Sequence, residues 1–429
     1  MTKRNPFQTT RRGFLGGTAA LGAAAAGGFL LQPGRALAAS PRERKFLFFF
    51  AGGGWDTSQV FEPKFGDDAG GVDMDDMTFL GSSTNGQLRW TAGEDRPAVS
   101  RYFERWGWRS SIVNGIDTHS IGHGAGTRFM LTGSSASSLS DWPTLLASQT
   151  EQDLSMPHVV FGGPSFAGPR GATLVRGGGG TLLDLIDGSI GGRADDPSPT
   201  APRPTDFMAD AFVHRRIDRF AQLQTGQGRK RGEELLGSLE RSMELEGREF
   251  EAGLGDSTRG LLEQAVRATE LMRLGLSRCA MLRIPGGYDT HGNNAPQGPQ
   301  QDAFFDVLDR LCDHLALTPG HASPTLLDEV VIVAMSELGR TPRLNGGGGK
   351  DHWPFGSMLV AGPGVAGGRT IGATDPGLVG VAIDHATGLP SSSGDILGCE
   401  SVGSALLRLG GVDAEEFLQG VQPLSALLA

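Results

Sequence analysis

Cysteine is scarce in this chain of 429 residues, and its placement excludes a cysteine-based metal cluster. The three cysteines are Cys279, Cys312 and Cys399, and they lack the short spacing that metal ligands share. An odd number of cysteines permits at most one disulfide within the chain, so a disulfide-stabilised framework is also excluded. We expect the thiols to behave as small buried apolar groups.

Clustered positive charge is also lacking. The formal net charge is -10, acidic and basic residues are mixed along the chain, and lysine is rare beside arginine. Because proteins that bind nucleic acid carry a basic patch or stripe, this distribution argues against nucleic acid as the main partner.

The first 38 residues have the pattern of an export signal. Arg11 and Arg12 precede Phe14 and Leu15, which resembles a twin-arginine motif, and an apolar stretch follows over 16–31. Ala36, Leu37 and Ala38 offer a small-x-small cleavage site. The apolar stretch is short and rich in glycine and alanine, so a signal peptide at 1–38 is favoured over a membrane span, although an uncleaved anchor stays open. The pattern predicts export to the periplasm or the exterior through the export machinery, with no stable membrane span after cleavage.

The rest of the chain, 39–429, favours one α/β core that carries an insertion. Alternation of strand-like and helix-like segments indicates a mostly parallel sheet with crossover helices. The apolar runs fall at 45–51, 112–113, 158–161, 279–284, 329–335 and 357–361, and helical patterns fall at 97–107, 142–146, 300–317, 402–409 and 414–418. Between 162 and 276 the chain is first rich in glycine and proline and then helical in its spacing, which predicts a loop-rich and helical insertion.

Carboxylates and histidines follow the ends of several expected strands. Asp56 lies just past the run 45–51, and Asp289 and His291 lie just past the run 279–284, both after paired glycines. Glu337 follows the run 329–335, and His352 comes shortly afterwards. Because sites in open α/β sheets form at the carboxyl ends of strands, the sequence predicts a metal site made of these five residues.

The chain resembles secreted proteins of the DUF1501 type, which look like members of the alkaline phosphatase and sulfatase superfamily. The segments that carry the resemblance are 287–294, 336–342 and 351–354. The resemblance implies a three-layer α/β/α core over 39–429 with a mostly parallel sheet. It also implies that Asp56, Asp289, His291, Glu337 and His352 hold metal.

Two positions depart from the superfamily pattern. Counting back from the Thr132-Gly133 pair, the place of the nucleophilic hydroxyl is taken by His123, which either binds metal or accepts a phosphoryl group. Leu338 stands where the superfamily has a histidine ligand. Thr127 and Ser120 are the nearby hydroxyls, and neither lies in the matching register.

These residues favour a metal-dependent hydrolase of phosphate or sulfate esters, on a small molecule or a glycan. A divalent ion, preferably zinc and otherwise manganese or calcium, lowers the pKa of a bound water and makes a hydroxyl nucleophile unnecessary. His123 is then a catalytic candidate, and Arg128 and Arg340 are candidates for contact with the ester anion.

Structural alternatives stand beside several of these assignments. Asp56 and Asp289 could cap the following turns. Glu337 could pair with Arg340 or Arg343, and Arg128 could bridge surface carboxylates. The alternative function is a non-catalytic exported binding or assembly protein, a pseudoenzyme on the same fold.

Overall fold

The computed structural model describes residues 39–150, 154–176, 204–226 and 260–429, with isolated positions between 228 and 237. The predicted signal segment 1–38 and much of the predicted insertion lie outside the described residues. Among the described residues, no helix has the length and apolar character needed to cross a membrane.

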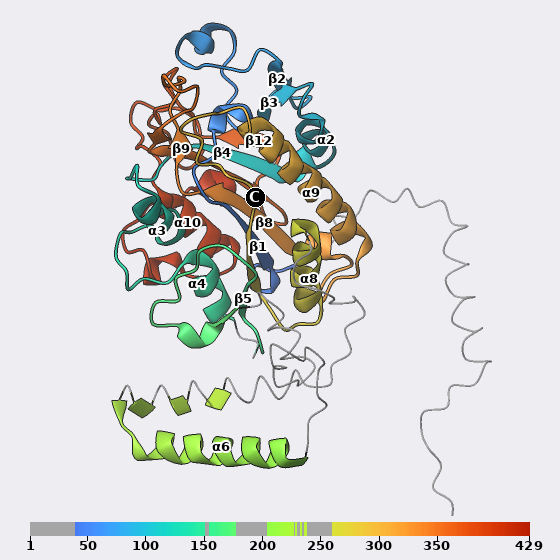
Figure 1. The fold of residues 1–429 in the computed structure, drawn as a ribbon, viewed down its shortest axis with the longest axis vertical. Helices are drawn as coiled ribbons and strands as arrows, with labels where there is room; N and C mark the ends of the chain where they lie inside the picture. Colours follow the sequence, from blue (N-terminus) through green and yellow to red (C-terminus); the bar gives the residue numbers. More distant parts are fainter. Residues whose placement is uncertain are drawn as a thin grey trace, which may run out of the picture. The chain divides into compact units, whose positions relative to one another are not determined.

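A mostly parallel sheet of eight strands forms the centre of the fold (Figure 1). In spatial order, its strands are β12 (Arg369–Ile371), β4 (Ser110–Asp117), β11 (Phe355–Ala361), β8 (Val330–Ser336), β1 (Lys45–Ala51), β7 (Cys279–Arg283), β5 (His158–Val160) and β6 (Leu174–Arg176). Only β11 runs antiparallel to its neighbours β4 and β8. The carboxyl ends of β1, β7 and β8 therefore meet at one edge.

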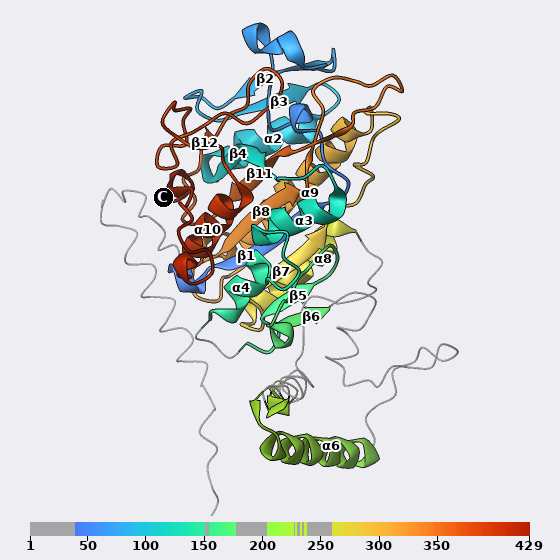
Figure 2. The ribbon, with the colours of Figure 1, turned by 90° about the vertical axis from the view of Figure 1, so that its left-hand side faces the viewer.

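Helices cover both faces of this sheet (Figure 2). One face packs against α3 (His123–Thr132), α4 (Trp142–Ser148) and α10 (Cys399–Leu409). The other packs against α2 (Pro97–Trp106), α8 (Leu261–Arg273) and α9 (Gln297–Leu317). A mixed α/β fold with a mostly parallel sheet, as predicted, is thus confirmed.

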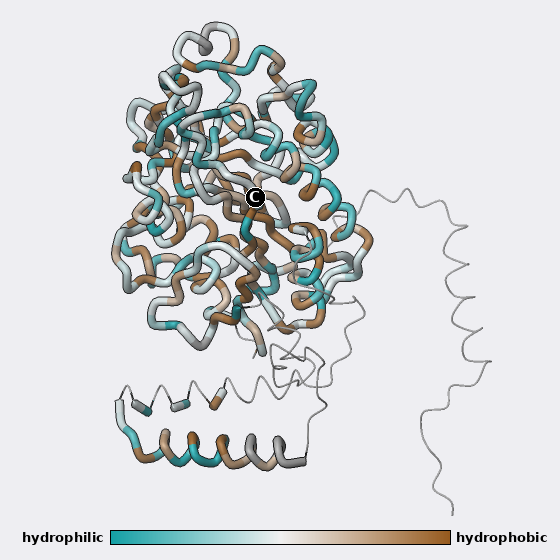
Figure 3. The backbone as a smooth tube through the Cα atoms, in the orientation of Figure 1, coloured by the Kyte–Doolittle hydropathy of each residue, from teal (hydrophilic) through white to brown (hydrophobic). Residues whose placement is uncertain are grey.

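Strand β1 shows why the sheet is buried on both sides. Phe46, Phe48 and Phe50 belong to the core on the α3 face, whereas Leu47 and Phe49 belong to the core on the α9 face. Because side chains alternate across a strand, a continuous apolar run supplies both cores at once. Figure 3 shows the same feature as hydrophobic colouring of the central strands.

The structure also describes further strands and another helix. They are the hairpin of β2 (Thr78–Ser82) and β3 (Arg89–Gly93), the short pair β9 (Gly339–Arg340) and β10 (His352–Trp353), and helix α6 (Pro204–Leu223). The expected helix at 414–418 is only a 3-10 turn over Ala414–Glu416. The residue pattern alone left helix α3 open, because its glycines weaken helix propensity, whereas the superfamily resemblance implied a helix that carries Thr132 and Gly133. Helix α3 ends at Gly133, whose φ of 69° suits a left-handed cap.

Candidate metal site

The site forms where the carboxyl ends of β1, β7 and β8 come together. Gly53, just past β1, donates its backbone N–H to Glu337 Oε1 at 2.7 Å, which ties the β1 end to the β8 end. Gly53 has φ of 115°, and a Cβ at this position would lie 2.6 Å from the Asp289 backbone nitrogen. Only glycine therefore permits this approach of the β1 and β7 loops.

Two histidines reach this edge from other elements. His123 is the first residue of α3. His352 belongs to β10, where it is paired with Arg340 of β9 in antiparallel register. Helix α3 and the short β9–β10 pair thus bring two histidines from distant parts of the sequence to one place.

The carboxylate of Asp289 is the point where the imidazoles converge. Asp289 Oδ1 lies 3.1 Å from His291 Nε2 and 3.2 Å from His352 Nε2, and Asp289 Oδ2 lies 3.5 Å from His123 Nε2. The Nε2 atoms of His291 and His352 are 3.0 Å apart. His123, Asp289 and His352 form a group whose ligand atoms all lie within 4.8 Å of one another.

The other ring nitrogen of each histidine faces an acceptor. His123 Nδ1 is 2.8 Å from Glu337 Oε1, His291 Nδ1 is 2.8 Å from Asp351 Oδ1, and His352 Nδ1 is 2.7 Å from the backbone oxygen of Ile121. Each Nδ1 therefore donates a proton, and in the neutral imidazole Nε2 keeps a lone pair. In that neutral form, the Nε2 lone pairs of all three rings are turned towards Asp289.

This arrangement fits a bound cation. Lone pairs of three imidazoles and an ionised carboxylate repel one another unless positive charge, a metal ion or added protons, lies among them. Ligands about 2.0–2.1 Å from a tetrahedral zinc ion are about 3.3 Å from one another, close to the separations of 3.0, 3.1, 3.2 and 3.5 Å found around Asp289. Carboxylate and carbonyl partners on the outer nitrogens are the usual support of histidine metal ligands.

The carboxylates of the site are held ionised. Burial alone would raise the pKa of Asp289, but the hydrogen bond and the charge of Arg340 lower it well below its usual range. The pKa of Asp351 is also lowered, chiefly by its hydrogen bond with His291. Half of the Asp289 side chain is exposed, so the convergence point is open to solvent.

Asp56 lies in a different environment from the other predicted ligands. Its side chain is fully buried; Oδ2 is 2.8 Å from Lys350 Nζ and accepts from Asn294 at 2.8 Å. Oδ1 accepts from the Ser58 backbone N–H and hydroxyl, which makes Asp56 the cap of the turn Thr57–Gln59. Burial raises the pKa of Asp56, but the charge of Lys350 outweighs it and holds the carboxyl ionised. Its oxygens are thus already occupied by protein donors, as in the capping alternative.

Glu337 and Arg340 support the site from within the protein. Glu337 is buried and accepts hydrogen bonds from Gly53 N–H and from the Ser336 hydroxyl at 2.9 Å, besides facing His123. Arg340 is fully buried, and its guanidinium donates to Asp289 Oδ1 at 2.6 Å and to the backbone oxygens of Gly53, Gly54 and Lys350. Arg340 therefore orients Asp289 and has its donors engaged by the protein.

The remaining candidates lie outside the convergence point. Arg128 stacks its guanidinium 4.8 Å from the Phe166 ring centre. The Thr127 hydroxyl donates to the His123 backbone oxygen at 2.6 Å, and the Ser120 hydroxyl contacts Gly122. His119 pairs with Asp117 at 3.2 Å, before α3 begins. Neither hydroxyl is thus directed by its hydrogen bonds towards Asp289.

Sequence reasoning did not assign three supporting groups: Asp351, Lys350 and the Ile121 backbone oxygen. Asp351 had a usable signal, since it directly precedes His352 and a carboxylate beside a histidine is a common supporting partner. The roles of Lys350 and Ile121 depend on contacts between residues far apart in the chain, to which sequence spacing gives no access.

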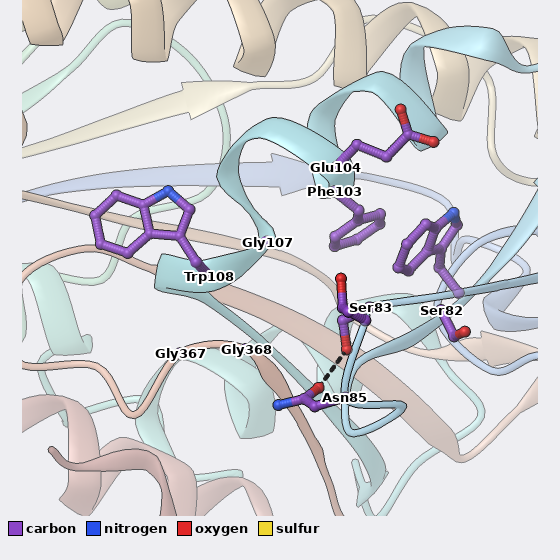
Figure 4. A pocket seen from close by; sticks show the side chains of 11 residues that line it. Ser82, Ser83, Asn85, Phe103, Glu104, Gly107, Trp108, Gly367 and Gly368 are labelled. Atoms are coloured by element: carbon purple, nitrogen blue, oxygen red, sulfur yellow. Dashed lines mark hydrogen bonds between the residues drawn. The ribbon is translucent and has the colours of Figure 1, made fainter.

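A hollow of about 580 Å³ lies elsewhere (Figure 4). Ser83, Asn85, Phe103 and Trp108 help to line it. Trp108 precedes β4, whose direction matches that of β1 and β8, so the hollow lies towards the opposite end of the sheet from the Asp289 cluster.

Comparison with known families agrees with part of the predicted resemblance. Residues 240–387 match the model of a family described as "Protein of unknown function (DUF1501)". The matched span covers less than half of the chain, but it includes Asp289, His291, Glu337, Arg340 and His352. No curated protein matches the chain.

Proposed function

We propose that this protein is an exported metal-dependent hydrolase of phosphate or sulfate esters, with an alkaline-phosphatase-like core. The metal would be held by His123, Asp289 and His352, with His291 beside them. Zinc suits this set best, since imidazole nitrogen with one carboxylate is a common zinc ligand set.

The observation that carries this proposal is the shared orientation of the three imidazoles. Each Nδ1 faces an acceptor, so each Nε2 lone pair is turned towards the Asp289 carboxylate. A structural ion pair would need only one histidine proton facing the carboxylate. Three converging lone pairs at ligand-like separations instead favour a cation as the common partner.

The chain's own residues would prepare this site for hydrolysis. A divalent cation bound there supplies Lewis acidity and lowers the pKa of a water to about 7. Arg340 fixes the Asp289 carboxylate, and Glu337 and Asp351 fix the rings of His123 and His291. The open side of Asp289 leaves room for an ester to approach. The hydrogen bonds of Thr127 and Ser120 favour water over a hydroxyl side chain as the attacking group.

One observation favours the second candidate, a non-catalytic exported binding or assembly protein. Neither of the hydroxyls near His123 is directed into the site, so a covalent route of the superfamily type lacks its nucleophile there. A protein that retained the metal ligands alone would bind metal without turning over an ester. Metal content and turnover therefore separate the two functions.

Metal analysis of the mature protein, purified without chelators or a histidine tag, tests the site. We expect about one equivalent of zinc by elemental mass spectrometry, lost in a His123→Ala/His352→Ala double variant, because two of three ligands are removed. His119→Ala is the matched control, since His119 pairs with Asp117 and is not in the convergent group, and this variant should keep its metal.

Ester turnover then separates the two functions. Hydrolysis of p-nitrophenyl phosphate or p-nitrophenyl sulfate that disappears with the metal would support the hydrolase. Bound metal without hydrolysis of either ester would favour the binding protein. A folded wild type that takes up no zinc on reconstitution would contradict the metal site itself.

A further inference from the structure

A hydrolase that acts on an ester anion needs a cationic group free to contact the substrate. The two arginines expected in that role are engaged elsewhere. Arg340 is buried with its guanidinium donating to four acceptors, and Arg128 is stacked on Phe166. A guanidinium at this edge of the sheet with no partner of its own is therefore a further candidate for the anion contact.

Arg283 is an arginine at this edge of the sheet whose guanidinium is free. It is the last residue of β7, it is exposed, and its side chain forms no hydrogen bond or ion pair within the part of the chain that the structure describes. Six residues later the same loop reaches Asp289. Arg283 thus stands at the start of the loop that carries the convergence point.

Pairing between β7 and β1 brings Arg283 towards the site. Arg283 is in register with Phe50. A Cβ at Gly52 would lie 3.9 Å from Arg283 Nη2, and the next residue, Gly53, contacts both Asp289 and Glu337. The guanidinium therefore lies beside the glycine loop that joins the predicted metal ligands.

Strand alternation places Arg283 on the same face of the sheet as α3. Cys279 and Met281 of β7 belong to the core that contains Met130 and Leu131 of α3, whereas Leu282 belongs to the opposite core. Arg283 continues the first set, since side chains two apart on a strand share a face. His123 is the first residue of α3, so Arg283 and His123 lie on the same face of the sheet.

Glycines bring backbone close to Arg283. A Cβ at Gly162 would lie 3.2 Å from Arg283 Cβ, and Gly163, with φ of 91°, follows it. Gly52, which follows β1, lies beside the Arg283 guanidinium. A free guanidinium among backbone groups is a suitable donor for two oxygens of one tetrahedral anion.

We infer that Arg283 is the anion-binding residue of this site and that its ligand is a tetrahedral oxyanion, the phosphoryl or sulfuryl group of the substrate. This inference rests on the proposed hydrolase for its biological meaning. The binding of the anion can be measured without turnover.

The test is titration of inorganic phosphate, and in a second arm inorganic sulfate, into the wild type and variants by isothermal calorimetry. Each protein is used metal-free and zinc-reconstituted. Arg283→Ala should weaken binding of the preferred anion by at least about tenfold, the loss of about 1.4 kcal/mol expected for one charge-assisted contact. Arg283→Lys should bind the anion with an affinity between those of the wild type and Arg283→Ala, because an ammonium keeps the charge but lacks the bidentate geometry of a guanidinium.

Arg310→Ala is the matched control. Arg310 lies on α9, on the opposite face of the sheet, and pairs with Asp306, so the same change of charge should leave anion binding unaltered. The arm that gives the tighter binding identifies phosphate or sulfate as the substrate anion.

Unchanged anion binding in Arg283→Ala, or no binding of either anion by the wild type in either metal state, would overturn the inference. Zinc content and ester turnover, measured on the same samples, report separately on the proposed function. Anion binding that needs Arg283 in a protein without metal would support this anion site and count against the hydrolase.

Discussion

At the scale of single residues, the buried pair of Lys350 and Asp56 is costly to disturb. Both side chains are fully buried, and Lys350 Nζ lies 2.8 Å from Asp56 Oδ2 and 3.2 Å from the Ser58 hydroxyl. Two charges removed from water are stable only while each has the other and its hydrogen bonds. The pair joins the loop before His352 to the loop after β1.

Replacing Lys350 with methionine should therefore lower the free energy of unfolding by about 3–5 kcal/mol, because Asp56 is left as an uncompensated buried charge. Urea denaturation followed by circular dichroism measures this change. The double variant Asp56→Asn/Lys350→Met should recover part of the loss, since it removes both charges. A single variant as stable as the wild type would show that Asp56 is neutral or hydrated in the native protein.

At the scale of elements, the position of α3 depends on one glycine. A Cβ at Gly126 would lie 2.7 Å from the Glu337 backbone oxygen. The helix can therefore approach the end of β8 closely only with glycine here. That approach also brings His123 Nδ1 within 2.8 Å of the Glu337 carboxylate.

Gly126→Ala should destabilise the protein by about 1–3 kcal/mol, a typical cost of overpacking, and should weaken zinc retention because His123 moves with the helix. Thermal denaturation and zinc release to a chelator measure the two effects. Gly124→Ala is the control on the same helix, because a Cβ there has no atom within 4 Å. It should be neutral or stabilising by up to about 1 kcal/mol. Equal behaviour of the two variants would contradict the packing argument.

At the scale of the whole molecule, buried His158 makes stability depend on pH. The ring is fully buried at the start of β5, with Nδ1 3.2 Å from the Thr144 hydroxyl, and Nε2 has no hydrogen-bond partner within the described chain. Burial lowers the pKa of His158 from 6.5 to about 4. The unfolded chain therefore binds a proton between these two pH values that the native protein does not.

The sign of this effect follows from proton linkage. The stability contributed by neutral His158 is fully present above pH 6.5 and is lost as the pH falls through the interval from 6.5 to about 4. The shift corresponds to about 3 kcal/mol at the lower end. Urea denaturation at pH 7 and pH 4 should show that the wild type loses about this much more stability than His158→Gln, whose side chain does not titrate. Equal losses in the two proteins would contradict the assignment.

Most of the α/β core could be predicted from the sequence, because local pattern determines it. The apolar runs at 45–51 and 279–284 correspond to β1 (Lys45–Ala51) and β7 (Cys279–Arg283), since a short and largely apolar run is typical of a strand buried on both faces of a sheet. The positions of Asp289, His291 and Glu337 just past strand ends also followed from this pattern. Helix α3 did not follow from this pattern, because its glycines lower the helix propensity of the segment. Packing against the sheet stabilises the helix nonetheless.

The sequence by itself determined which chemical groups are gathered at the carboxyl edge of the sheet. Only the tertiary structure decided their roles, because these depend on distances between residues from separate strands. Asp56 and Asp289 follow similar glycine pairs, yet Asp56 is buried against Lys350, whereas Asp289 is half exposed among three imidazoles. Arg340 and Arg283 differ in the same way: one guanidinium is enclosed by backbone acceptors, and the other is free at the edge of the site.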